Sequence, residues 1–79
     1  MPSLPLVSGV ELIKALLAKG FVLNRIRGSH HILINNDLKI TVSVPVHKGK
    51  KLGRGITVYI IKDAGLKVQE VYQILKKRY

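Results

Sequence analysis

Three apolar runs separated by very short connections constrain the middle of this chain more than any other feature. The runs cover residues 21–26, 30–35 and 39–44, and they are bounded by glycine or by an Asn-Asp turn signal. In the third run apolar and polar residues alternate, as expected for a half-buried strand, and Pro45 ends it. Parallel strands need a long crossover connection, which is absent here, so the three strands are predicted to form an antiparallel meander.

Helical periodicity flanks this meander on both sides. Ser8 and Glu11 fit the Ser-x-x-Glu pattern of a capping box, and the apolar spacing that follows predicts a helix over residues 9–19. Two further helices are predicted over residues 56–64 and 67–77. The order α-β-β-β-α-α predicts an α+β domain in which helices cover one face of a three-stranded antiparallel sheet.

The composition fits one small domain. Apolar residues make up 47% of the 79 residues, which is enough for a packed core. We expect a single domain over residues 1–79, with a flexible tail at residues 1–7. The chain has no cysteine, which excludes disulfides and thiolate metal sites. With no long apolar run and no recognisable signal peptide, we expect a cytoplasmic protein without membrane contact.

The charge is strongly basic. Fourteen Lys and Arg residues against four carboxylates give a formal net charge of +10. The excess predicts an anionic partner, either nucleic acid, an acidic protein or both, although a basic surface can also serve only solubility. Part of the charge lies in a glycine-rich loop at residues 46–55, where exposed amides and cations could contact phosphate. A solvated loop is the alternative.

The segment Gly28-Ser29-His30-His31 between the first two strands is the candidate site. Gly28 either supplies a turn that needs positive φ or lets a phosphate approach the backbone. Neighbouring strand residues point to opposite faces, so one histidine should face the helices and the other the open face of the sheet. If His31 and Leu33 point inward, His30 lies on the open face, and the reverse arrangement buries His30. A structural role is the alternative for either histidine.

The scarcity of carboxylates bears on the type of chemistry. Two-metal cleavage of a phosphodiester needs clustered carboxylates, and the four in this chain are scattered. RNA carries its own nucleophile, the 2′-hydroxyl, so its cleavage needs only proton transfer and stabilisation of charge on the phosphate. Histidine beside Lys or Arg can supply both, and DNA, which lacks the hydroxyl, should be spared.

The chain resembles the HicA-type toxins of bacterial and archaeal toxin–antitoxin modules over residues 8–75. The matching segments, in order, are Glu11–Leu16, Gly20-Phe21, Arg27–His31, Thr41–Pro45 with His47, Leu52 with Gly55, and Ile60–Leu66. The resemblance implies a double-stranded-RNA-binding-domain-like fold, metal-independent cleavage of messenger RNA and neutralisation by a HicB-type antitoxin. It also implies that His30, the first histidine of Gly-Ser-His-His, is catalytic and that Gly28 is the matching glycine.

We therefore expect a toxin endoribonuclease with His30 as catalytic acid/base and with no metal ion or cofactor. The expected substrate contacts are Arg27, Gly28, Ser29, Lys48, Lys50 and Lys51, and the expected partners are RNA and an acidic antitoxin. The antitoxin should cover His30 and contact Ile32 and Ile34, provided that these residues face outward. The alternatives are a non-catalytic RNA-binding module of the same fold and a small basic structural protein bound to nucleic acid.

Overall fold

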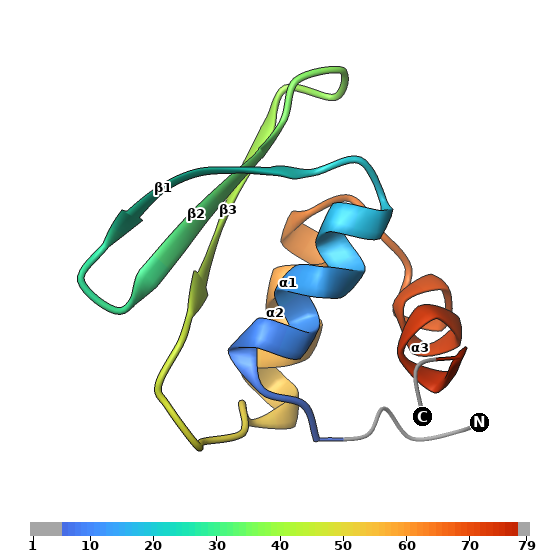
Figure 1. Cartoon of the computed structure of the whole chain (residues 1–79). Coiled ribbons are helices and arrows are strands. Elements are labelled where there is room, and N and C mark those ends of the chain that lie inside the picture. The colour runs from blue at the N-terminus through green and yellow to red at the C-terminus, as the bar shows by residue number, and fades with distance from the viewer. Residues whose placement is uncertain (1–5, 78–79) are drawn as a thin grey trace.

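The computed structural model describes residues 6–77, and this part of the chain contains helices and strands in the predicted order (Figure 1). Their bounds are α1 Gly9–Ala18, β1 Val22–Arg27, β2 His30–Asn35, β3 Ile40–Pro45, α2 Arg54–Asp63 and α3 Val68–Lys77. The strands form one antiparallel sheet in the order β1-β2-β3. The predicted α+β meander is therefore confirmed.

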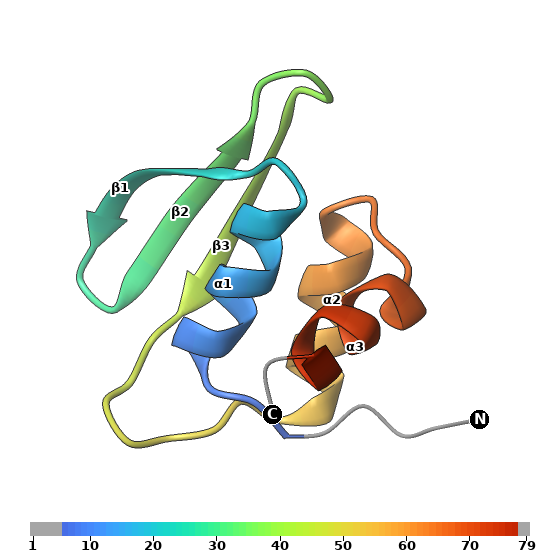
Figure 2. The same ribbon diagram turned by 45° about the vertical axis from the view of Figure 1, so that its right-hand side comes forward.

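The helices lie on one face of the sheet and leave the other face open (Figures 1 and 2). Helices α1 and α2 pack against β3, and α3 packs against α1 and α2. The turn between β1 and β2 projects away from the helices, and every residue of β1 is exposed. No helix in the described range is long and apolar enough to cross a bilayer.

The core between sheet and helices decides which way β2 faces. Leu33 is completely buried, and it pairs with Val42, which is also buried. Each such side chain stabilises the fold by about 1.5–3 kcal/mol relative to exposure. Because strand side chains alternate, His31 shares the inward row with Leu33, and His30 lies on the open face. The sequence was compatible with either histidine pointing inward, and the structure has His31 inward and His30 on the open face.

The predicted tail over residues 1–7 is wrong at Val7. The Val7 side chain is 1% exposed, and the backbone carbonyl oxygen of Val7 accepts a hydrogen bond from the Leu52 amide at 2.7 Å. The backbones of Ser8 and Lys51 form an isolated antiparallel β-bridge. Val7 and Ser8 therefore pack against the segment that precedes α2. In the rest of the predicted tail, Leu6 is exposed, and residues 1–5 lie outside the described residues.

Helix α1 begins with the predicted capping box. The Ser8 hydroxyl oxygen accepts from the Glu11 amide at 3.2 Å, and the Glu11 carboxylate accepts from the Ser8 amide at 2.8 Å. The Lys51 ammonium lies 3.5 Å from the same carboxylate. The Ser8 amide, and next the charge on Lys51, lower the pKa of Glu11 below its ordinary value of 4.5, and burial opposes this only in part.

Replacing Glu11 with Gln is expected to lower the free energy of unfolding near neutral pH by about 0.3–1 kcal/mol, because an anion is lost from the first turn of a helix. The pKa of Glu11 is lower in the folded than in the unfolded state, so its stabilisation is present above pH 4.5 and is lost as the pH falls through the folded-state pKa. The difference in Tm between parent and Glu11→Gln should therefore vanish in strong acid.

Thermal unfolding followed by circular dichroism over a pH series measures this effect. The control is Asp37→Asn, which removes a carboxylate from the exposed turn after β2. A stability difference for Glu11→Gln that is unchanged in strong acid would show that the charge of Glu11 is not what stabilises α1.

Candidate functional site

His30 is exposed at the first position of β2, directly after a tight turn. The turn residues are Gly28 and Ser29, and Arg27 pairs with His30 across them. Gly28 has φ of +59°, which suits glycine at the first central position of a two-residue hairpin turn. A Cβ atom on Gly28 would meet no atom within 4 Å, so backbone conformation rather than lack of space accounts for the glycine.

A β-bulge in β1 places two arginines on the same face as His30. The pairing register shifts before Arg25, which leaves Asn24 as the extra residue. Beyond the bulge, Arg25 opposes Ile32 and Arg27 opposes His30. Directly opposed residues of antiparallel strands project from the same face. If the alternation had continued without the bulge, both arginines would project towards the helical side of the sheet.

An open hollow of about 530 Å³ lies beside His30 and spans all three strands. Its lining residues are Arg27, Gly28, His30, Ile32 and Ser43. The sequence-predicted residues Arg27, Gly28 and His30 are thus brought together, and none of the carboxylates in residues 6–77 lines the hollow. Ser43 was not predicted as a site residue. The alternation of the third apolar run placed it on the outward face, but only the strand register brings it beside Ile32.

The predicted loop lysines line a separate hollow of about 440 Å³ between the first turn of α1 and the loop after β3. Its lining includes His47, Lys48, Lys50 and Lys51. Val46, which lines this second hollow, donates its amide to the carbonyl of Ser29, the turn residue before His30, at 2.7 Å. The loop therefore starts beside the His30 turn, although its lysines do not reach the His30 hollow.

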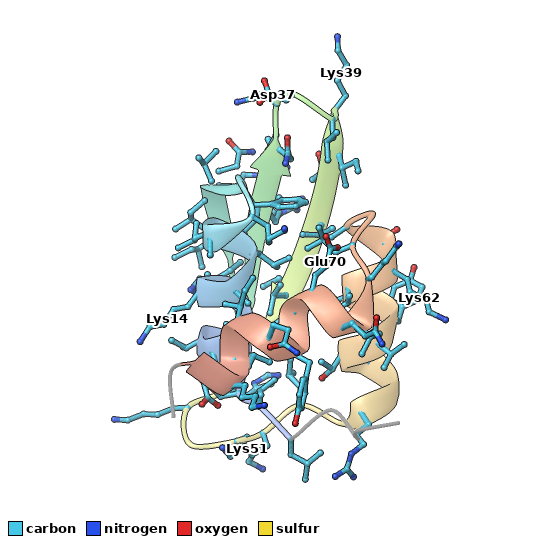
Figure 3. The ribbon with its side chains drawn as sticks, turned by 90° about the vertical axis from the view of Figure 1, so that its right-hand side faces the viewer. Lys14, Asp37, Lys39, Lys51, Lys62 and Glu70 are labelled. Carbon is cyan, nitrogen blue, oxygen red and sulfur yellow. The ribbon has the colours of Figure 1, made fainter. Side chains whose placement is uncertain are left out.

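The arginines near His30 are not neutralised. Among the described residues the ion pairs are Lys19 with Glu70 and Lys51 with Glu11, so neither Arg25 nor Arg27 has a carboxylate partner. Asp37 lies at the end of the molecule opposite Lys51 (Figure 3). Nor do three His, Asp or Glu side chains gather anywhere in residues 6–77 to form a potential metal site. The open face thus presents uncompensated positive charge beside an imidazole.

Ile32 and Ile34 share the open face with His30 and so face outward, as the expected partner contact requires, but both are half-buried. Neighbouring side chains on β1 and β3 flank them, because Ile32 stands between Arg25 and Ser43 in the pairing. The large exposed apolar residues of the sheet are instead Val22, Leu23 and Ile26 of β1. Ile32 forms part of the hollow rather than a protruding contact.

His31 points to the helical side and is half-buried between Ile26 and Val44. Its Nδ1 atom is buried and has no hydrogen-bond partner among the described residues. An unpaired polar atom in such a place lowers stability by about 1–3 kcal/mol. His31 therefore lies on the other side of the sheet from the hollow, where its role is structural.

Replacing His31 with Leu is expected to leave Tm unchanged or to raise it, because leucine occupies the apolar site without an unpaired nitrogen. His31→Ala should instead lower the free energy of unfolding by about 1–2 kcal/mol, because it removes packing against Val44. Thermal unfolding of both variants measures the contrast. Equal destabilisation by Leu and Ala would mean that the ring nitrogens are hydrogen-bonded in solution.

Comparison with known proteins adds one finding. A family model described as HicA toxin of bacterial toxin–antitoxin matches residues 9–66. No curated protein matches the chain. The matched range includes α1, the whole sheet and α2, and with them the lining of the His30 hollow and that of the second hollow except Ser8. The order of elements is consistent with the double-stranded-RNA-binding-domain-like fold expected from the resemblance. Because the model matches well over half of the residues, the chain belongs to the HicA toxin family.

Proposed function

We propose that this chain is a toxin endoribonuclease that cleaves messenger RNA in the cytoplasm, with His30 as catalytic acid/base and without a metal ion. The observation that supports this most directly is the exposed imidazole of His30 in a hollow that also contains Arg27 and no carboxylate. Histidine is the side chain best suited to proton transfer near neutral pH. A guanidinium beside it attracts and polarises phosphate.

In the proposed reaction the 2′-oxygen of RNA attacks the neighbouring phosphorus while the bond from phosphorus to the 5′-oxygen breaks. Neutral His30 accepts the proton of the 2′-hydroxyl, and the resulting imidazolium returns a proton to the 5′-oxygen. In this proposal Arg27 and Gly28, which line the hollow with His30, hold the phosphate, and Arg27 stabilises its developing negative charge. Such a reaction consumes no water and needs no cofactor.

The second candidate function is RNA binding without cleavage. The observation in its favour is that the loop lysines line their own hollow, away from His30. A binder of this kind would contact the phosphates of the RNA backbone through Lys48, Lys50 and Lys51 together with the Ser29 turn. It would lose little when His30 is truncated, which separates it from the enzyme. A basic structural protein bound to nucleic acid makes the same prediction and also implies no toxicity.

We also propose that an acidic HicB-type antitoxin neutralises the toxin by covering the face that carries His30. The support is electrostatic, since Arg25 and Arg27 have no carboxylate partner within the described residues. Opposite charge accelerates encounter, and aromatic or aliphatic side chains then anchor such complexes. Ile32 supplies apolar surface in the lining of the hollow.

His30→Ala is expected to reduce the rate of RNA cleavage by about 10²–10⁴-fold, the usual contribution of general acid–base catalysis. Because His30 is exposed, the free energy of unfolding should change by no more than about 0.5 kcal/mol. The matched control is His47→Ala, an exposed histidine that lines the other hollow. Cleavage of a labelled RNA by purified, folded proteins gives the rates, and full activity of His30→Ala would refute the catalytic assignment.

Replacing Lys48, Lys50 and Lys51 together by Ala should weaken binding to all RNA sequences. The slope of log affinity against log salt should fall by about 0.7 for each single-strand phosphate contact that is lost. Binding is measured in the His30→Ala background, so that the RNA stays intact. The control removes three exposed lysines on the helices, Lys14, Lys62 and Lys76. If both triple variants reduce the slope equally, the loop lysines are not the residues that contact the RNA phosphates.

A further inference from the structure

The hollow beside His30 includes one side chain with no part in the function proposed so far, Ser43. It reaches the hollow from β3, the strand on the far side of His30 from Arg27. In the pairing, His30 opposes Pro45 and Ile32 opposes Ser43. Ser43 is therefore the diagonal neighbour of His30 on the same face, at a Cα separation of about 7–8 Å.

The hydroxyl of Ser43 is available to a ligand. Ser43 is exposed, and within residues 6–77 its side chain makes no hydrogen bond. Its partner Ile32 is apolar, and Pro45, the residue opposite His30, has no side-chain donor. A serine hydroxyl can donate one hydrogen bond, and a hydrogen bond to a charged acceptor is stronger than one between neutral groups.

The donors of the hollow thus stand on both sides of the imidazole. Arg27 lies on the β1 side and has no carboxylate partner among the described residues, and Ser43 lies on the β3 side. A phosphodiester has two non-bridging oxygens, which can accept from two donors at once. Arg27 lies one strand from His30, about 4.8 Å away, and its long side chain can extend over the imidazole. The Ser43 side chain is short, so the phosphate would have to lie between His30 and Ser43 to accept from both donors.

We propose that Ser43 is a substrate-positioning residue whose hydroxyl donates a hydrogen bond to a non-bridging oxygen of the phosphate that Arg27 holds from the other side. The RNA backbone would then cross the sheet from β1 to β3 over His30, and it would leave towards the loop that begins at Val46. This inference rests on the proposed function, because it places the RNA that His30 cleaves.

The test compares Ser43→Ala with Ser43→Thr, which keeps the hydroxyl. The control is Thr41→Ala, because Thr41 is exposed on the same face of β3 but pairs with Ile34 and lies outside the hollow. The first measurement is kcat and KM on a single-stranded RNA oligonucleotide. The second is the affinity for the same oligonucleotide with 2′-O-methyl riboses, which cannot be cleaved by the 2′-oxygen, so that binding is measured apart from cleavage.

Ser43→Ala should lower kcat/KM on the order of tenfold or more, as expected for a lost hydrogen bond to a charged group, at unchanged Tm. It should also weaken binding of the 2′-O-methyl RNA, whereas Ser43→Thr and Thr41→Ala should behave like the parent. The inference would be overturned if Ser43→Ala bound this RNA like the parent, or if Thr41→Ala lost as much binding. It would also be overturned if Ser43→Thr failed to restore binding, or if the parent did not bind this RNA. A parent that binds but does not cleave would refute the proposed function alone, since the binding comparison still decides the role of Ser43.

Discussion

The burial of Leu33 in the middle strand is the constraint on which the site depends. Leu33 and its partner Val42 are both enclosed between the sheet and the helices. A strand has a side-chain period of two, so this single burial holds His30 and Ile32 on the opposite face. A slip of one residue in the register would expose Leu33 and turn His30 towards the helices. The hydrophobic core therefore specifies where the imidazole lies, although His30 itself contributes nothing to that core.

Two local features complete the site around this register. The bulge at Asn24 turns Arg25 and Arg27 to the open face, at a position where regular pairing would have turned them inward. At the other side of β2, the start of α1 lies so close to the end of β3 that a Cβ atom on Gly9 would collide with the carbonyl oxygen of Pro45. Helix α1 thereby braces the strand end that pairs with His30. The helices hold the site from behind without occupying the face on which RNA would bind.

The sequence predicted the strands and the outward position of one histidine because alternation and short turns are local signals. Lys39 to Val44 shows its inward and outward residues plainly, and β2 has the bounds that were predicted. The bulge could not be predicted from the sequence, because Asn24 is compatible with a regular strand and nothing around it marks an extra residue. That Ser43 lies near His30 could not be predicted for a different reason. The hollow is formed by three strands, and which residues meet in it depends on the pairing register between those strands. The inclusion of Val7 in the core depends likewise on a contact with Leu52, far along the chain.

The central claim, that His30 moves protons while the RNA supplies the nucleophile, is tested most directly by identifying the ends of the cleavage products. The parent protein is incubated in excess EDTA with an RNA oligonucleotide and with a copy that carries deoxyribose at the mapped cleavage position, and the products are analysed by mass spectrometry. Attack by the 2′-oxygen predicts 2′,3′-cyclic phosphate and 5′-hydroxyl ends, and no cleavage at the deoxyribose. Products with 5′-phosphate ends, cleavage at the deoxyribose, or activity that stops in EDTA and returns with Mg²⁺ would contradict the account.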